Sequence, residues 1–216
     1  MTTTIHDVWN DVYEYEASET EASIDREAVS GLLNRVDECD GSTAEKSLLR
    51  GYIAYHLPCD ATRDVNVESE LEAVLAFEPR NTTAHLYLAH HHFDSRNFSE
   101  ALKNLRQIDV DKYIAIGQKW RALKIEELVL AAMIHLSPRS VSPDDVIHFS
   151  DELLAAGTEH SAVPLELVNS LLENKSRVDQ AWSVPVLRNV VTHLRKAIDE
   201  TADTSLLKEE TDMIAR

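Results

Sequence analysis

The sequence predicts an all-α protein, and three observations lead to that fold class. The 216 residues include only 5 Gly and 6 Pro, so the chain has few of the residues that tight β-turns need. Apolar side chains recur at the i, i+3, i+4 spacing of amphipathic helices along almost the whole chain. No segment alternates apolar and polar residues for long enough to form a convincing strand.

Two helices are expected at the N-terminus. Residues 5–17 place apolar side chains at helical spacing. Ser23 is expected to cap a second helix over residues 24–36, with Asp25 and Glu27 suiting the positive end of its dipole. The segment DECDGST then ends this helix.

Four further helices are expected before residue 109. Ser42 or Thr43 starts the first of them, which runs through Leu57 and is ended by LPCDAT. Pro79 disfavours helix at the residue before it, so a turn is expected there. The other three helices cover about residues 65–77, 82–94 and 98–108.

The second half of the chain is expected to open with one long helix over residues 112–136. SPRSVSPDD is the clearest linker, and it also begins a helix, because Ser142 can cap, Pro143 suits the first helical position and two acids follow. Pro185 lies inside one later helix and should kink it or delay its start. The later helices are expected near residues 143–156, 163–175, 178–199 and 204–214.

The charge is strongly acidic and unevenly distributed. The net charge is −17, and residues 1–45 hold 12 acids and 2 bases. Nucleic-acid phosphates and anionic membranes repel such a chain, so neither is an expected partner. The acidity either serves to keep the protein soluble or attracts a basic partner to the N-terminal region. Residues 96–124 carry a local positive charge, with 7 bases and 3 acids. This charge indicates either a docking surface for an acidic peptide or an intramolecular contact with the acidic N-terminus.

The sequence predicts a cytoplasmic location. The sequence has no run of 18 or more apolar residues, the length that a membrane-spanning helix needs. At the N-terminus, no basic region precedes an apolar run, as a secretory signal would require. Cys39 and Cys59 are the only cysteines and form no CxxC pair, so they are expected to be reduced thiols.

The histidine run HHHFD is the one candidate for chemistry. His90 and Asp94 stand at i, i+4, where they can either hold a metal ion or form a plain helix pair. A catalytic zinc ion needs three protein ligands, and HExxH, GxSxG and GxxxxGK[ST] are all absent. No catalytic residue, metal ligand or cofactor is therefore predicted. A metal-dependent enzyme built on His90, His91 and His92 stays as an alternative.

A weak internal repeat indicates which positions of a helical hairpin the histidines occupy. One copy reads His85-x2-Leu88-Ala89-x2-His92 followed by Phe98, Ala101 and Leu105, and a preceding copy reads Gly51-x2-Ala54-Tyr55 and closes at LAFEP. Residues 48–110 thus resemble two tetratricopeptide repeats. His85 and His92 replace residues that are aromatic in that family.

The resemblance implies stacked antiparallel helical hairpins that form a short right-handed solenoid over residues 41–136. Residues 1–40 would be an acidic N-terminal cap, and residues 143–216 a C-terminal helical group. Ala89 and Ala101 would lie where two helices of a hairpin cross. His85 and His92 would pack between hairpins.

The resemblance also implies a binding function. In the family, the first helix of each pair lines a concave groove that binds peptide. The matching positions here are Thr83, Leu86, His90, Phe93 and Asp94, and Phe93 is expected to be the main anchor. The sequence thus predicts a non-enzymatic adaptor or scaffold with a protein or peptide partner. A second hypothesis is an acidic inhibitor or immunity protein that covers a basic toxin or nuclease.

Overall fold

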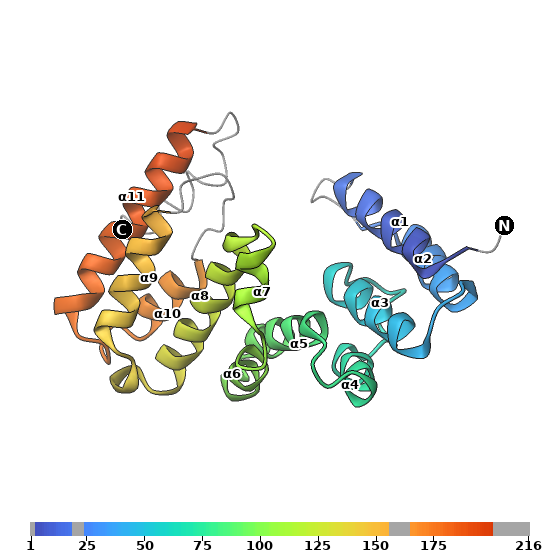
Figure 1. The fold of residues 1–216 in the computed structure, drawn as a ribbon, viewed down its shortest axis with the longest axis horizontal. Helices are drawn as coiled ribbons and strands as arrows, with labels where there is room; N and C mark the ends of the chain where they lie inside the picture. The colour runs from blue at the N-terminus through green and yellow to red at the C-terminus, as the bar shows by residue number, and fades with distance from the viewer. Residues whose placement is uncertain (1–2, 19–23, 156–164, 201–216) are drawn as a thin grey trace. The chain divides into compact units, whose positions relative to one another are not determined.

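The computed structural model describes residues 3–18, 24–155 and 165–200, and over these residues the protein is all-α (Figure 1). Eleven α-helices take up 76% of the described residues. The extended structure within that part of the chain is a single isolated bridge between Thr4 and Asp40. The predicted fold class is confirmed, while the solenoid arrangement stays a prediction.

The chain forms two compact units, called here unit 1 (Met1–Asn97) and unit 2 (Phe98–Arg216). The boundary between them falls inside residues 41–136, the stretch expected to hold the helical repeats. Each unit has its own apolar core.

Unit 1 contains five helices. Helix α3 is central, because α1, α2, α4 and α5 all pack against it. Its Gly51 allows the close approach of α4, since a Cβ atom there would lie 2.9 Å from Leu71 Cδ2. The helices are α1 (Ile5–Ser18), α2 (Arg26–Glu38), α3 (Thr43–His56), α4 (Val67–Phe77) and α5 (Thr82–Asp94).

Side-chain caps explain where these helices begin. Ser42 and Glu45 form a capping box at α3, as expected for a start at Ser42 or Thr43. Asn66 and Asn81 cap α4 and α5. Helix α2 starts later than predicted, because Asp25 is its cap and accepts a 2.8 Å hydrogen bond from the Glu27 amide. Ser23 lies outside the described residues.

The core of unit 1 joins all five helices. The side chains of α1, α2 and α3 that are completely buried include Val8, Val12, Val29, Val36, Leu49 and Ile53. Leu71 and Val74 of α4 pack with Ala84 and Leu88 of α5 in an adjoining cluster. The packing of this core determines which faces of α1, α3 and α5 point away from it.

Unit 2 is built around α8, which packs against α6, α7, α9 and α10, while α11 lies along α9 (Figure 1). Its core includes Ile134, Phe149, Leu167 and Val186. The helices are α6 (Phe98–Leu105), α7 (Val110–Ala115), α8 (Lys119–Leu136), a short 3-10 turn (Pro138–Ser140), α9 (Pro143–Ala155), α10 (Leu165–Glu173) and α11 (Gln180–Glu200).

One prediction about unit 2 needs correction. The single helix expected over residues 112–136 is broken between α7 and α8, because Gly117 adopts a left-handed φ of 78° that ends α7. Pro185 lies in the second turn of α11, which begins at Gln180, and the kink expected at Pro185 stays a prediction. The helix expected over residues 204–214 lies outside the described residues.

The two alanines that the repeat singled out are both completely buried. Ala89 belongs to unit 1 and Ala101 to unit 2, so their expected crossing stays a prediction. Among the described helices, none is long and apolar enough to cross a membrane.

Candidate binding face

The three consecutive histidines point to different neighbours. His92 is buried with its Nε2 3.8 Å from Glu68 of α4, whereas His90 lies beside Tyr55 of α3 with 6.3 Å between the ring centroids. His85 is also buried, and its Nε2 is 3.1 Å from the Pro79 carbonyl oxygen. The burial expected of His85 and His92 is confirmed.

The residues predicted to bind a partner segment differ in how much of their surface is exposed. Asp94 is exposed and accepts a 2.7 Å hydrogen bond from the Tyr55 hydroxyl, so it and His90 share the surface beside Tyr55. Thr83 and Leu86 are half-buried. Phe93 is only 7% exposed, and therefore has little surface to offer a partner.

A row of aromatic rings crosses the three odd-numbered helices of unit 1. We call it the aromatic face, and it consists of Trp9 and Tyr13 on α1, Tyr52, Tyr55 and His56 on α3, and Tyr87 and His90 on α5.

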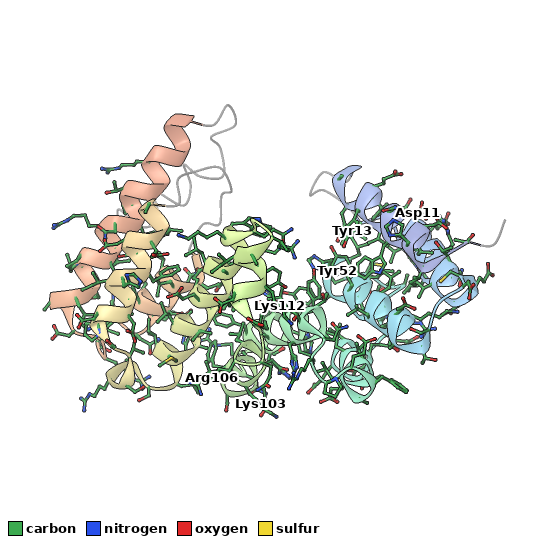
Figure 2. The ribbon with its side chains drawn as sticks, in the orientation of Figure 1. Asp11, Tyr13, Tyr52, Lys103, Arg106 and Lys112 are labelled. Atoms are coloured by element: carbon green, nitrogen blue, oxygen red, sulfur yellow. The ribbon has the colours of Figure 1, made fainter. Side chains whose placement is uncertain are left out.

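Each ring of the aromatic face contacts the next. Trp9 lies 4.8 Å from Tyr52 edge to face, and Tyr52 stacks on His56 at 4.3 Å. Tyr87 then contacts Tyr52 at 5.0 Å between centroids. Figure 2 shows Tyr13 and Tyr52 close together, one from α1 and one from α3. Such edge and stacked pairs favour a fixed arrangement of the rings.

The aromatic face is only partly covered. Tyr52 is 5% exposed and belongs to the core, but Tyr13 is 52% exposed. The His56 side chain is 36% exposed, and Trp9, Tyr55, Tyr87 and His90 are half-buried. The row thus presents ring edges and faces to solvent across three helices.

A carboxylate stands near each end of the row. Asp94 bonds to Tyr55, and Glu16 of α1 accepts a 2.9 Å hydrogen bond from the Tyr52 hydroxyl. Burial, with the nearby Tyr87 and Glu16, raises the pKa of Tyr52, so its hydroxyl stays a donor. Burial lowers the pKa of His56, and Glu16 only partly opposes this shift, so the imidazole is neutral at pH 7.

Unit 1 also carries most of the negative charge. Residues 1–97 hold 19 acids and 7 bases, a net charge of −12 out of the −17 of the whole chain. Asp11 pairs with Arg35, and Asp37 with Arg50. Many other acids of α1 and α2 are exposed, including Asp7, Glu14, Glu27 and Glu38.

Four of the seven bases in the stretch 96–124 pair with acidic side chains of unit 2. Lys103 pairs with Glu100 at 2.9 Å, Lys119 with Glu152 at 3.1 Å and Lys124 with Glu127 at 2.8 Å, while Lys112 is 3.9 Å from Asp109. Arg121 lies over the ring of Trp120, 4.9 Å from its centroid. Figure 2 labels Lys103 on α6, Arg106 directly after the end of α6, and Lys112 on α7. These pairings weaken the case for an acidic-peptide docking surface here.

The histidine run does not assemble a metal site. Over the part of the chain that the structure describes, no three His, Cys, Asp or Glu side chains are grouped so that they could hold a metal ion. The His91 and His92 rings lie 5.9 Å apart at their centroids, and His92 faces Glu68. The metal-enzyme alternative gains no support from this geometry.

A sequence signal for the aromatic face was present. Each of α1, α3 and α5 carries aromatic or histidine side chains three or four residues apart. Tyr52 and Tyr55 recur as Tyr87 and His90 at a spacing of 35 residues, close to the tetratricopeptide period of about 34. This spacing marks the part of the row that lies on α3 and α5, whereas Trp9 and Tyr13 of α1 do not follow it.

Comparisons of the chain with protein-family models, with curated proteins and with solved structures find no match.

Proposed function

We propose that unit 1 is a non-enzymatic protein-binding module and that a segment of a partner protein lies across the aromatic face. The observation that carries this proposal is the partial exposure of six of the seven connected rings on α1, α3 and α5. Rings that serve only the core would be covered, as Tyr52 is.

The energetics of interfaces favour this use of the rings. Tyr and Trp are enriched among the few residues that dominate binding energy, because they cover a large area with few rotatable bonds. The rings here are also held in place by one another, so little side-chain entropy is lost on binding. The anchoring role expected of Phe93 passes to Tyr13, Tyr55 and Tyr87, which have more exposed surface.

Charge complementarity favours a basic partner segment. Glu16 and Asp94 stand near the two ends of the aromatic face, and unit 1 has a net charge of −12. Opposite charge on a partner would steer its approach and exclude acidic competitors. The same acidity supports a second version of the function, in which the protein inhibits a basic toxin or nuclease by covering it.

Selection of peptide ligands tests the proposal and does not require the partner to be identified first. Random 12-residue peptides are displayed, selected on the full-length protein, synthesised and measured by calorimetry. Three variants are compared with the parent protein. Tyr13→Ala and Tyr55→Ala each remove an exposed ring of the aromatic face. Phe77→Ala is the matched control, because Phe77 is 70% exposed on α4 and is not part of the face.

We expect each tyrosine variant to weaken peptide binding by about tenfold or more, since losing an interface anchor costs about 2 kcal/mol. The affinity for Phe77→Ala should stay within about twofold of the parent, because a residue that does not contact the peptide changes the binding free energy by less than about 0.5 kcal/mol. Melting temperatures show that each variant is folded. The proposal would be contradicted by selected peptides that bind both tyrosine variants as tightly as the parent protein, or that lose affinity for Phe77→Ala.

A further inference from the structure

Only one of the two oxygens of the Glu16 carboxylate accepts a hydrogen bond in the described part of the chain. Its Oε2 accepts the hydrogen bond from Tyr52, whereas its Oε1 is buried and has no hydrogen-bond partner among the described residues. Leaving a buried acceptor unsatisfied carries a desolvation penalty. Such a group in a folded protein therefore calls for an explanation.

The neighbouring imidazole of His56 does not supply the missing charge at neutral pH. His56 Nδ1 lies 3.8 Å from Glu16 Oε1, too far for a hydrogen bond. Burial lowers the pKa of His56, so its ring carries no charge at pH 7. Glu16 thus has no cationic partner among the rings of the aromatic face.

The local field of α1 also favours a cation at this point. Glu16 lies in the last turn of α1, where the helix dipole is negative and cations are preferred. This last turn contains no basic residue. Glu16 adds a negative charge at a point where a positive charge would be stabilising.

The rings beside Glu16 provide the other half of a cation site. Tyr13 and Trp9 stack at 5.5 Å with an angle of 29° between their planes, and Tyr13 is 52% exposed. Tyr13 also meets Tyr52, the hydrogen-bond donor to Glu16, at 6.0 Å. The negative faces of aromatic rings attract cations, and a nearby carboxylate strengthens that attraction.

We infer that Glu16, Tyr13 and Trp9 form a receptor for one arginine side chain of the partner segment. The inference rests on the proposed function and specifies its chemistry. Arginine fits better than lysine, because its planar guanidinium can lie on the exposed ring of Tyr13 and pair at the same time with the Glu16 carboxylate, whose side chain is 25% exposed. The arginine would supply the donor and the positive charge that this end of the aromatic face lacks.

Three capped amino acids serve as probes of the receptor. They are N-acetyl-arginine amide, N-acetyl-citrulline amide, which is its neutral isostere, and N-acetyl-lysine amide. Each is titrated into the full-length protein at 150 mM salt, and the indole N–H signal of Trp9 is followed by NMR, with Trp9→Phe used to assign it. Glu16→Gln keeps an oxygen for the Tyr52 hydroxyl but removes the charge. Glu14→Gln is the matched control, because it removes the same charge from an exposed position of α1.

We expect the arginine probe to shift the Trp9 signal in a saturable way and to bind about tenfold more tightly than citrulline, the fold-change expected when a charge-assisted hydrogen bond is lost. Glu16→Gln should remove this preference, and Glu14→Gln should change it by less than about twofold, as screening by salt allows for an exposed charge.

Several results would overturn the inference. They are an equal response to citrulline, an unchanged response in Glu16→Gln, or an equal loss in Glu14→Gln. An equal response to the lysine probe would overturn the assignment to arginine. These failures are distinct from failure of the proposed function, because peptides that depend on Tyr13 and Tyr55 would still show a binding face even if the arginine probe did not bind.

Discussion

The hydroxyl of Tyr52 and the carboxylate of Glu16, 36 residues apart in the sequence, are joined by a hydrogen bond of 2.9 Å. This bond fastens α1 to α3 at one end of the aromatic face. Because Tyr52 is 5% exposed, the bond connects the core of unit 1 to the proposed binding surface.

Tyr52→Phe should destabilise unit 1 through the loss of this bond. Hydrogen bonds to charged groups are worth about 1.5–3 kcal/mol, and partial exposure of Glu16 lowers the expected loss to about 1 kcal/mol. Urea denaturation measures it. Tyr55→Phe is the control, since it removes a hydroxyl from the same helix that bonds to the exposed Asp94. Equal losses in the two variants would show that the Tyr52 bond has no special role.

The titration of His56 should make stability depend on pH. Its pKa is lowered by burial, so the folded protein binds a proton at His56 less readily than the unfolded chain, whose ordinary value is 6.5. The stabilising contribution is therefore complete above about pH 6.5 and is lost as the pH falls toward the lowered folded pKa. The groups that face His56 are Glu16 of α1, Tyr52 and Tyr55 of α3, and Tyr87 of α5.

The measurement is the free energy of unfolding of the parent and of His56→Gln at pH 8 and pH 5. The parent should lose more stability than the variant over this interval, and the other titrating groups cancel in the difference. A smaller loss in the parent would mean that Glu16 stabilises the charged imidazole more than burial destabilises it.

Ala101→Leu should overpack unit 2. Ala101 is completely buried on α6, which packs against α8, so three added carbon atoms have no space. Overpacking of this kind costs about 1–3 kcal/mol. Thermal unfolding measures the loss, and Ala181→Leu, at an exposed position of α11, should leave the melting temperature nearly unchanged. An unchanged melting temperature for Ala101→Leu would contradict the packing.

Glu127→Ala should loosen α10. Glu127 is 1% exposed, pairs with Lys124 at 2.8 Å, and its Oε1 accepts a 3.1 Å hydrogen bond from the Leu167 amide. Removing it leaves a buried amide without an acceptor, which costs about 1–3 kcal/mol. Amide hydrogen exchange over α10 should become faster.

Glu127→Gln separates the hydrogen bond from the charge. Burial raises the pKa of Glu127 although Lys124 opposes the shift, so the carboxylate is costly to hold there. The glutamine keeps an oxygen for the Leu167 amide and removes that cost. It should therefore be less destabilising than alanine. Equal losses would indicate that the ion pair with Lys124, and not the capping of α10, is what stabilises this contact.

Local patterns in the sequence were enough to predict most of the helices. Ser42 and Glu45 form a capping box three residues apart, and such an interaction can be read within a few residues. Gly117 was missed because a lone glycine within an apolar helical pattern is often tolerated, and only its positive φ shows that α7 ends there.

The binding face was harder to predict, because it depends on contacts between distant segments. The repeat pattern predicts Phe93 on the groove side of its helix. Phe93 stands four residues after the fully buried Ala89, however, and it lies on the buried stripe of α5. The exposed side carries Tyr87, His90 and Asp94. Glu16 and Tyr52 likewise come together only through the packing of α1 on α3.

Site-specific photocrosslinking tests the central claim, that the aromatic face holds a partner segment, most directly. Benzoylphenylalanine is placed at position 13, position 55 or position 77 in cells that make the protein, and the crosslinked residues are identified by mass spectrometry. Position 77 is the exposed control on α4. Positions 13 and 55 are expected to crosslink to one segment of a single partner, and this segment should contain an arginine. Crosslinks from position 77 alone, or crosslinks from positions 13 and 55 to unrelated proteins, would contradict the central claim.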